Sequence, residues 1–297
     1  MTGSISASEI ILTVNSPPDL NSLVTAALAE DGADRDITTL ALVPPAQQGS
    51  ATFIAKAEGV IAGFEAVAET LRQVDSALIL DIQVQDGAKV APGDIIATVS
   101  GPLAGILAAE RTALNFLGHL SGVATAASQV VRAIEGTGCR LRDTRKTIPG
   151  LRLLEKQAAA AGGAANHRIG LHDAVLIKDN HLAAVRDRDL GIADAILLAR
   201  DVNPGVKIEV EVTTLAEAQE AAEVGADELL LDNMPPAHVR EIVLALGENR
   251  PLLEASGNIT LDNAREYAET GVDFISMGAI THSAPALDIS LEVEPVP

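Results

Sequence analysis

The alternation of apolar and polar residues changes character near residue 137. Before that point, strand-like and helix-like segments follow one another without a regular order. Helices are expected over 21–31, 63–74 and 103–134, and strands over 50–57, 78–84 and 95–99. The turn at Pro17-Pro18-Asp19 is expected to cap the first helix. The first third of the chain therefore predicts a small α+β domain.

The long helix expected over 103–134 has two distinct sides. An apolar stripe at three- and four-residue spacing predicts a buried face, made of Phe116, Leu120, Val123, Ala127, Val130 and Ile134. A second band holds Arg111, Asn115, Gly118, Gly122 and Gln129. Each glycine inside a helix costs about 1 kcal/mol against alanine. We therefore expect a close neighbour on this side: a packed helix first, or else another stretch of backbone or a ligand.

Beyond residue 137, short apolar runs alternate regularly with helical segments. The runs, expected as strands, cover 140–143, 174–178, 207–212, 228–232, 252–255 and 273–277. Helices are expected over 155–161, 192–200, 215–224, 236–246 and 261–270. Near-continuous apolar strands are typical of parallel strands buried on both faces. Regular β–α alternation predicts a parallel sheet or an α/β barrel.

Composition excludes several classes of protein. Aromatic residues make up only 2% of the chain, so platforms for stacking single-stranded nucleic acid are nearly absent. A net charge of -20 repels nucleic acid and anionic lipid. The short apolar run Ile10 to Val14 follows no basic segment, and no apolar stretch approaches about 18 residues. We expect a cytoplasmic protein that binds neither membrane nor nucleic acid, with no disulfide because Cys139 is the single cysteine.

One segment departs from the acidic average. Between residues 140 and 178, eight cations stand against three acids, so the segment carries +5 and the remainder of the chain −25. The cations are Arg140, Arg142, Arg145, Lys146, Arg152, Lys156, Arg168 and Lys178. Scattered surface arginines would be the ordinary explanation, but this basic segment crosses predicted strands and loops instead of following one helix face. It therefore predicts a pocket for a multiply anionic small molecule.

Polar residues also gather where the predicted strands end, which is where α/β barrels place their active sites. These ends hold 143–146, 178–181, Glu209 with Glu211, 232–233, Glu254 with 256–258, and 276–278. Each end has an ordinary explanation when taken alone, such as Asp232 as a helix cap or Glu209 as a surface residue. Six such ends in succession predict a catalytic rim.

Two features of this rim suggest particular ligands. Gly257 and Gly278 follow the last two strands and are expected to open helices, the first near Thr260, whose backbone N–H groups suit a phosphate. Glu211 and Asp232 end neighbouring strands, and paired carboxylates beside a phosphate are expected to hold Mg²⁺. The chain has no dinucleotide-binding, Walker A or serine-nucleophile motif. Displacement chemistry that relies on positioning and charge stabilisation is therefore favoured.

Seven sequence blocks, in order along nearly the whole chain, resemble the quinolinate phosphoribosyltransferase family. They are 110–122, 143–152, 162–181, 209–212, 231–234, 254–258 and 278–283, and the most specific are Asp-Thr-Arg-Lys-Thr at 143–147 and Lys-Asp-Asn-His at 178–181. The resemblance implies an incomplete α/β barrel of about seven strands over 118–283. It also implies a smaller α/β sandwich domain over 1–117, completed by the tail 284–297. A homodimer or a higher homo-oligomer such as a hexamer is expected.

The resemblance also implies the reaction. Phosphoribosyl pyrophosphate and quinolinate would give nicotinate mononucleotide, pyrophosphate and carbon dioxide, with Mg²⁺, in NAD biosynthesis. Arg145, Arg168 and Lys178 are expected to hold the quinolinate carboxylates. Beside them the resemblance places Thr144, His167 and, from a neighbouring subunit, Arg111.

The phosphoribosyl donor is expected on the other side of the rim. Lys146, Glu211 and Asp232 are the expected catalytic residues, with Lys146 near the pyrophosphate and the two acids near the ribose hydroxyls and Mg²⁺. The 5-phosphate and its surroundings are assigned to Ser256, Gly257, Asn258, Met277, Gly278, Ala279 and His282.

Other functions remain open on the residues alone. A paralogue, such as the molybdenum-locus homologue or a nicotinate phosphoribosyltransferase, would relax the double carboxylate clamp. A Schiff-base barrel aldolase could use Lys146 or Lys178, because neighbouring cations lower the pKa of a lysine. A non-catalytic phosphate-binding regulator is disfavoured by the number of polar strand ends.

Overall fold

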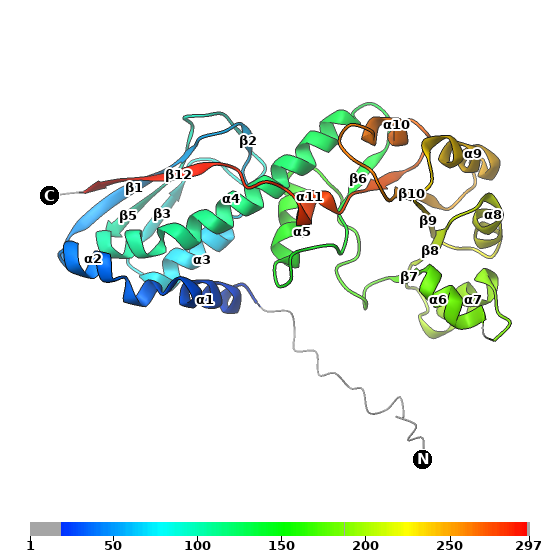
Figure 1. Ribbon diagram of the computed structural model, residues 1–297, viewed down its shortest axis with the longest axis horizontal. Coiled ribbons are helices and arrows are strands. Elements are labelled where there is room, and N and C mark those ends of the chain that lie inside the picture. Colours follow the sequence, from blue (N-terminus) through cyan, green and yellow to red (C-terminus); the bar gives the residue numbers. More distant parts are fainter. Residues whose placement is uncertain (1–18, 187, 296–297) are drawn as a thin grey trace, which may run out of the picture.

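The computed structural model describes residues 19–186 and 188–295. The apolar run at 10–14 and the prolines 17 and 18 lie outside this range, whereas Asp19 caps the first helix by accepting a hydrogen bond from the Ser22 N–H at 2.8 Å. Figure 1 shows two sheets side by side, joined by one long helix, α4 (Leu103–Ala133). No helix within the described ranges combines the length and the apolarity that crossing a membrane requires.

The N-terminal domain is built on a four-stranded antiparallel sheet with the order β12-β1-β5-β3. Its strands are β1 (Gln48–Ala55), β3 (Ile79–Ile82), β5 (Ile95–Pro102) and β12 (Ile289–Pro295), and β2 (Gly59–Val60) pairs separately with β4 (Lys89–Val90). The helices are α1 (Leu20–Asp31), α2 (Ile37–Leu42) and α3 (Phe64–Val74), with a 3-10 turn at Ala33–Arg35. Alternate residues of β1, such as Ala51 and Phe53, are buried. This burial pattern explains the period-2 apolar signal in the sequence.

The end of the chain returns to the N-terminal domain. β12 pairs with β1 in antiparallel register from Gly49↔Pro295 to Ala55↔Ile289. The first sheet is therefore completed by residues that follow the whole barrel in the sequence. No local pattern could have assigned β12 to this sheet, because its partner lies more than 200 residues earlier.

The second domain is an open α/β barrel. Six parallel strands have the order β6-β11-β10-β9-β8-β7: β6 (Arg140–Arg142), β7 (Val175–Ile177), β8 (Ile208–Val212), β9 (Glu228–Asp232), β10 (Leu252–Ser256) and β11 (Phe274–Ser276). All six predicted strands are confirmed. The seventh strand expected from the family resemblance is reduced to one residue, Ala165, which forms a single parallel bridge with Arg142 of β6. The barrel is therefore open between β6 and β7.

Most of the helices around the barrel agree with the apolar periodicity. They are α5 (Arg152–Ala161), α6 (Asp179–Arg186), α7 (Ile192–Val202), α8 (Leu215–Glu223), α9 (Pro236–Leu246), α10 (Ala264–Ala268) and α11 (Ala279–His282). The helix expected near Thr260 starts only at Ala264, because Thr260 to Asn263 form turns in which the Asn263 side chain accepts from the Thr260 N–H at 2.7 Å. Two short helices, α6 and α11, carry no apolar repeat long enough to have been predicted.

The helix α4 supports both domains. All six residues of its predicted apolar stripe are buried, as expected. The glycines on the other side of α4 face the backbone of the C-terminal tail and not a packed helix. The Leu287 N–H donates to the Gly118 carbonyl at 2.9 Å. A Cβ on Gly122 would stand 2.1 Å from the Pro285 carbonyl oxygen. These glycines therefore allow the C-terminal tail to cross the helix on its way to β12.

Replacing Gly122 with Ala should lower the free energy of unfolding by roughly 1–3 kcal/mol, as overpacking of a filled site does. The sign is informative, because glycine to alanine inside a free helix would stabilise by about 1 kcal/mol. Chemical denaturation measures the effect, with the exposed Gln129→Ala as the control on the same helix. A stabilised Gly122→Ala protein would show that the tail does not pack here.

Candidate active site

The loops at the carboxyl ends of the six strands form a continuous rim. Because all strands are parallel, every loop that follows a strand leaves the sheet at the same edge. These loops carry 143–147 after β6, Lys178 after β7, Glu211 and Asp232 at the ends of β8 and β9, 256–258 after β10, and 277–279 after β11. The strand order makes neighbours of residues that are far apart in the sequence.

The first contact along the rim joins the β6 and β11 loops. The Thr281 hydroxyl donates to the carbonyl of Lys146 at 2.8 Å. A Cβ on Gly278 would lie 2.9 Å from Lys146 Cδ and 3.2 Å from His282 Nε2. The Lys146 side chain therefore passes directly over Gly278, beside His282. A larger residue at 278 would displace that lysine.

The second contact joins the β9 and β10 loops. The Asn233 N–H donates to the Ser256 carbonyl at 2.8 Å, and the Asn258 side-chain amide donates to Asn233 Oδ1 at 3.1 Å. Gly257 has a φ of 93°, and a Cβ there would stand 2.2 Å from Asn233 Oδ1. Glycine is required at 257 for both its backbone angle and its closeness to Asn233.

The third contact joins β7 and β8. Lys178 Nζ lies 3.0 Å from Glu211 Oε2, and the lysine remains half exposed. On the neighbouring strand, Asp232 Oδ2 accepts from the Asn233 side chain at 2.7 Å. Glu211 and Asp232 thus end adjacent strands, as predicted, and both are partly accessible.

Two arginines near the rim lack acidic partners. Within the described ranges neither Arg145 nor Arg168 forms an ion pair; Arg168 donates only to the Ala174 carbonyl at 3.2 Å, and Arg145 Nε is buried without any partner. Burial, and then the charge of Arg145, lower the pKa of Arg168, although a guanidinium stays protonated at neutral pH. Two guanidinium groups close enough to repel each other form a site that an anion would stabilise.

Other cations of the basic segment have structural partners. Arg142 is buried inside the barrel, where its Nη1 donates to Glu228 and to Glu254 at 2.7 Å each, and its guanidinium lies 3.5 Å from the centre of the Phe274 ring. Buried Lys156 donates to Asp143. The remaining two are Arg152, which donates to Thr147 and to backbone carbonyls, and exposed Arg140 at the opposite end of β6. The predicted anion pocket therefore reduces to Arg145, Lys146, Arg168 and Lys178.

The inside of the barrel is charged, which the sequence did not reveal. Glu209, Glu228 and Glu254 are each at most 6% exposed. Glu209 therefore lies inside the barrel, which contradicts both its expected place on the catalytic rim and its ordinary explanation as a surface residue. The carboxylates of Glu228 and Glu254 outweigh burial and raise the pKa of Arg142, whereas burial and the charge of Glu209 raise the pKa of Glu254. The sequence does place acids within the apolar strands. That pattern alone does not tell which face of each strand lies inside the barrel.

Two family models match this chain. One, for the N-terminal domain of quinolinate phosphoribosyl transferase, matches residues 36–121, and the other, for its C-terminal domain, matches 123–292. The chain belongs to the quinolinate phosphoribosyltransferase family. The two matches meet inside α4, the helix that both domains share.

Several relatives of this chain are named nicotinate-nucleotide pyrophosphorylase. The nicotinate-nucleotide pyrophosphorylase (carboxylating) of Mycobacterium leprae is 41% identical over 263 residues, 87% of this chain and 91% of that protein. The probable enzyme of the same name from Bacillus subtilis is 39% identical, over 92% of this chain and 93% of that protein. The structure of nicotinate-nucleotide pyrophosphorylase from Francisella tularensis is 39% identical with a TM-score of 0.87, covering 94% of this chain and 98% of that one. These matches support the quinolinate phosphoribosyltransferase prediction and none of the alternatives.

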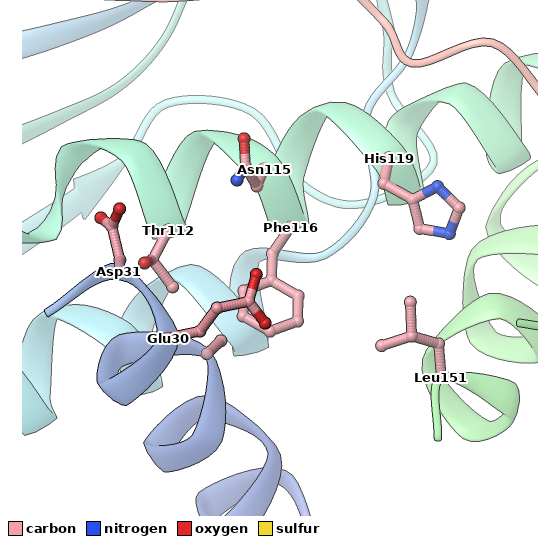
Figure 2. A pocket seen from close by; sticks show the side chains of 8 residues that line it. Glu30, Asp31, Thr112, Asn115, Phe116, His119 and Leu151 are labelled. Atoms are coloured by element: carbon pink, nitrogen blue, oxygen red, sulfur yellow. The ribbon is translucent and has the colours of Figure 1, made fainter. Parts of the chain in front are cut away.

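Two residues that the family resemblance assigned to the site have different surroundings. Both ring nitrogens of His167 are engaged inside the protein, with Arg168 and with Glu209. Exposed Arg111 lies on α4 with its guanidinium 4.0 Å from Glu110 Oε1, and it forms no ion pair with a rim residue among the described residues. A hollow of about 240 Å³ lies between α1, α4 and Leu151, and its lining includes Glu30, Asp31, Asn115 and His119 but not Arg111 (Figure 2).

Stability measurements should separate the structural cations from the rim cations. Arg142→Met leaves Glu228 and Glu254 buried without their guanidinium and should lower the free energy of unfolding by about 3–5 kcal/mol. Arg145→Met removes a cation that has no acid and repels Arg168, so its effect should stay within about 1 kcal/mol. Urea denaturation of both variants checks this, and equal losses would contradict the division.

Proposed function

We propose that this chain is a quinolinate phosphoribosyltransferase. It would transfer the phosphoribosyl group of phosphoribosyl pyrophosphate to quinolinate and release pyrophosphate and carbon dioxide, giving nicotinate mononucleotide for NAD biosynthesis. The observation that carries the proposal is the pair of guanidiniums, Arg145 and Arg168, that have no acidic partner among the described residues, at a rim that also presents Lys146 and Lys178. The printed names of the relatives agree with it.

Quinolinate is a dianion, and the cationic part of the rim suits it. Guanidinium groups bind carboxylates through two parallel hydrogen bonds, so Arg145 and Arg168 would hold the two carboxylates. Lys178 would add a third positive charge once a ligand competes with Glu211 for its ammonium group. Thr144, whose hydroxyl accepts from the Lys146 N–H at 3.0 Å, keeps the loop that bears Arg145 and Lys146 in a tight turn.

The opposite part of the rim suits the phosphoribosyl donor. Lys146, held across Gly278 and next to His282, would meet the pyrophosphate. The 5-phosphate would be bound by the glycine-containing loops, which carry Ser256, Gly257, Asn258, Met277, Gly278 and Ala279. Because α10 and α11 are short, backbone N–H groups and side chains of these loops would supply the contacts, rather than a long helix dipole.

Glu211 and Asp232 fit the predicted Mg²⁺. They present two carboxylates from adjacent strands beside the expected phosphate groups, and Mg²⁺ takes one or two carboxylates while phosphate and water complete its shell. When bound, the ion would neutralise charge on the departing pyrophosphate. The same acids can accept hydrogen bonds from ribose hydroxyls.

The reaction needs little covalent chemistry from the protein. The pyridine nitrogen forms a bond to C1 of the ribose as the bond from C1 to pyrophosphate breaks. The positive charge that develops on the ribose lies near Glu211 and Asp232, which can stabilise it. The ribosylated ring is a pyridinium, and it accepts the electron pair released when the neighbouring carboxylate leaves as carbon dioxide. A proton from solvent then replaces that carboxylate.

The assembly and location belong to the same proposal. Arg111 is exposed on the stretch of α4 whose buried residues, Ala109 and Ala113, pack in the core of the N-terminal domain, so it would complete the carboxylate pocket of a second copy in a homodimer or a higher oligomer. A cytoplasmic location agrees with the substrates.

Purified protein with quinolinate, phosphoribosyl pyrophosphate and Mg²⁺ should release pyrophosphate and carbon dioxide. Arg168→Ala should raise the KM for quinolinate by about 100-fold, the size expected for removing a charge-assisted bidentate contact. Labelled carbon dioxide release measures both. If nicotinate is accepted and no carbon dioxide appears, the proposal fails, and an unchanged KM would remove Arg168 from the pocket.

Complementation tests the role of Arg111. At quinolinate concentrations near the wild-type KM, Arg111→Ala and Arg168→Ala proteins should each be nearly inactive, whereas unfolding and refolding them together should restore activity. If Arg111 acts in the partner's site, random mixing gives about a quarter of the wild-type activity, because one site of each mixed dimer is intact. No recovery would place Arg111 in its own chain's site or outside the site.

A further inference from the structure

The turn that carries Arg168 lies in the open side of the barrel. Ala165 makes only the single bridge to Arg142, and residues 166–174 then cross from the edge of β6 to the edge of β7 without joining either strand. A pocket of about 330 Å³ opens against this segment. An arginine placed here has no sheet to fix its backbone, so its position must depend on side-chain contacts.

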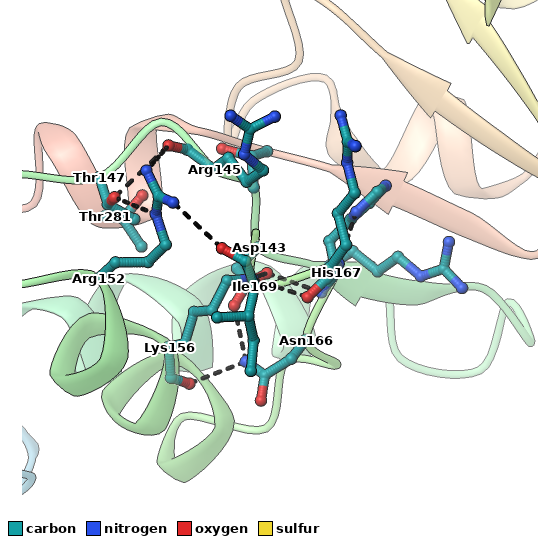
Figure 3. A network of polar contacts seen from close by, with 12 residues as sticks. Asp143, Arg145, Thr147, Arg152, Lys156, Asn166, His167, Ile169 and Thr281 are labelled. Atoms are coloured by element: carbon teal, nitrogen blue, oxygen red, sulfur yellow. Dashed lines mark hydrogen bonds and ion pairs between the residues drawn. The ribbon is translucent and has the colours of Figure 1, made fainter. Parts of the chain in front are cut away.

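Asp143 fixes the turn from the β6 side. Its buried carboxylate accepts from the His167 N–H at 2.8 Å and from the Asn166 side chain at 2.6 Å (Figure 3). Lys156 donates to the same carboxylate and to the His167 carbonyl at 2.9 Å. Both backbone groups of His167 are therefore held by buried charges.

The His167 ring continues this network towards β8. The Arg168 N–H donates to Nδ1 at 2.8 Å, and Nε2 lies 3.0 Å from Glu209 Oε2. A backbone N–H can only donate, so Nδ1 carries no proton and the proton of the neutral ring resides on Nε2, pointing at Glu209. The ring thus links a rigid strand to the peptide nitrogen of Arg168.

Neighbouring charges preserve this arrangement. Glu254 Oε1 lies 3.8 Å from Nε2, while the other oxygen of Glu254 is held by Arg142. Burial lowers the pKa of the His167 ring, but Glu209 and Glu254 more than offset burial, so the pKa is raised. Protonation of the ring would place a hydrogen on Nδ1, directly against the Arg168 N–H. His167, Glu209 and Glu254 each have a possible metal-ligand atom within 4.8 Å of the others. A proton on Nε2, however, leaves that nitrogen no lone pair with which to bind a metal ion.

We propose that Glu209 and His167 are positioning residues for Arg168. Glu209 holds the proton of His167 on Nε2, which keeps the Nδ1 lone pair available for the Arg168 N–H and so fixes the backbone from which the Arg168 side chain extends. In this arrangement His167 does not touch the quinolinate carboxylates. The inference rests on the proposed function only in naming quinolinate as the ligand of Arg168.

Substitutions of Glu209 separate positioning from direct binding. Glu209→Ala should weaken quinolinate binding about tenfold, in calorimetric Kd and in KM, with a smaller change in kcat. Glu209→Gln keeps an acceptor for the Nε2–H and should stay within about threefold of wild type. The matched control is Glu228→Ala, which removes the acid paired with Glu209 in strand register and should lower Tm while leaving the Kd within about twofold.

Nitrogen NMR of the histidine rings gives a readout that needs no turnover. At a pH well above its raised pKa, where the ring is neutral, His167 should appear in the Nε2–H form, and this should not change when quinolinate is added. In Glu209→Ala the two tautomers should mix, and the Arg168 amide should exchange with solvent faster. A ring that is an imidazolium, or that moves to Nδ1–H when quinolinate binds, would overturn the inference. So would a Glu209→Ala protein with wild-type affinity.

The two proposals can fail separately. If the wild-type protein does not bind or turn over quinolinate, the proposed function is wrong. The tautomer of His167 and the exchange rate of the Arg168 amide in Glu209→Ala would still decide whether the ring positions Arg168.

Discussion

A buried charge must be paired, and this requirement organises the barrel. Arg142 enters the interior from β6 and contacts Glu228 and Glu254, from strands β9 and β10, while Phe274 covers its guanidinium. The network links β6 to two other strands across an interior that would otherwise be filled by aliphatic side chains. Because Arg142 supplies the cation for these two acids, they do not need a cation from the rim.

The same requirement explains which arginines are available to a ligand. Arg142 is paired with two acids, whereas Arg145 and Arg168 have no acidic partner among the described residues and repel each other. Unpaired charges of one sign reduce stability, so their presence at a rim indicates a function that requires an anion. The basic segment therefore contains two kinds of cation that look identical in the sequence, one serving the fold and one serving the ligand.

The open side of the barrel and the returning tail are linked features. The tail leaves the barrel after α11, crosses α4 at Gly118 and Gly122, and adds β12 to the first sheet, so the two domains are joined by a continuous helix and by the returning tail. The missing strand between β6 and β7 leaves room for residues 166–174, which carry Arg168. A complete barrel would have held this turn in a sheet; here Asp143 and Glu209 do so with side chains.

Much of the fold was determined by local patterns that need no tertiary information. The six parallel strands, α4 with its buried stripe, and the polar rim all followed from apolar periodicity and from the common direction of parallel strands. The motif blocks around Arg145 and Lys178 identified the family correctly. Local patterns failed where a residue's partner lies far away in the sequence. The strand β12 pairs with β1, and the burial of Glu209 depends on which face of β8 lies inside the barrel. The ring nitrogens of His167 contact one group on β8 and one in its own turn. Sequence spacing decides which residues can share a strand or a helix face, but only the closed packing of distant segments decides which charges find a partner and which are left for a substrate.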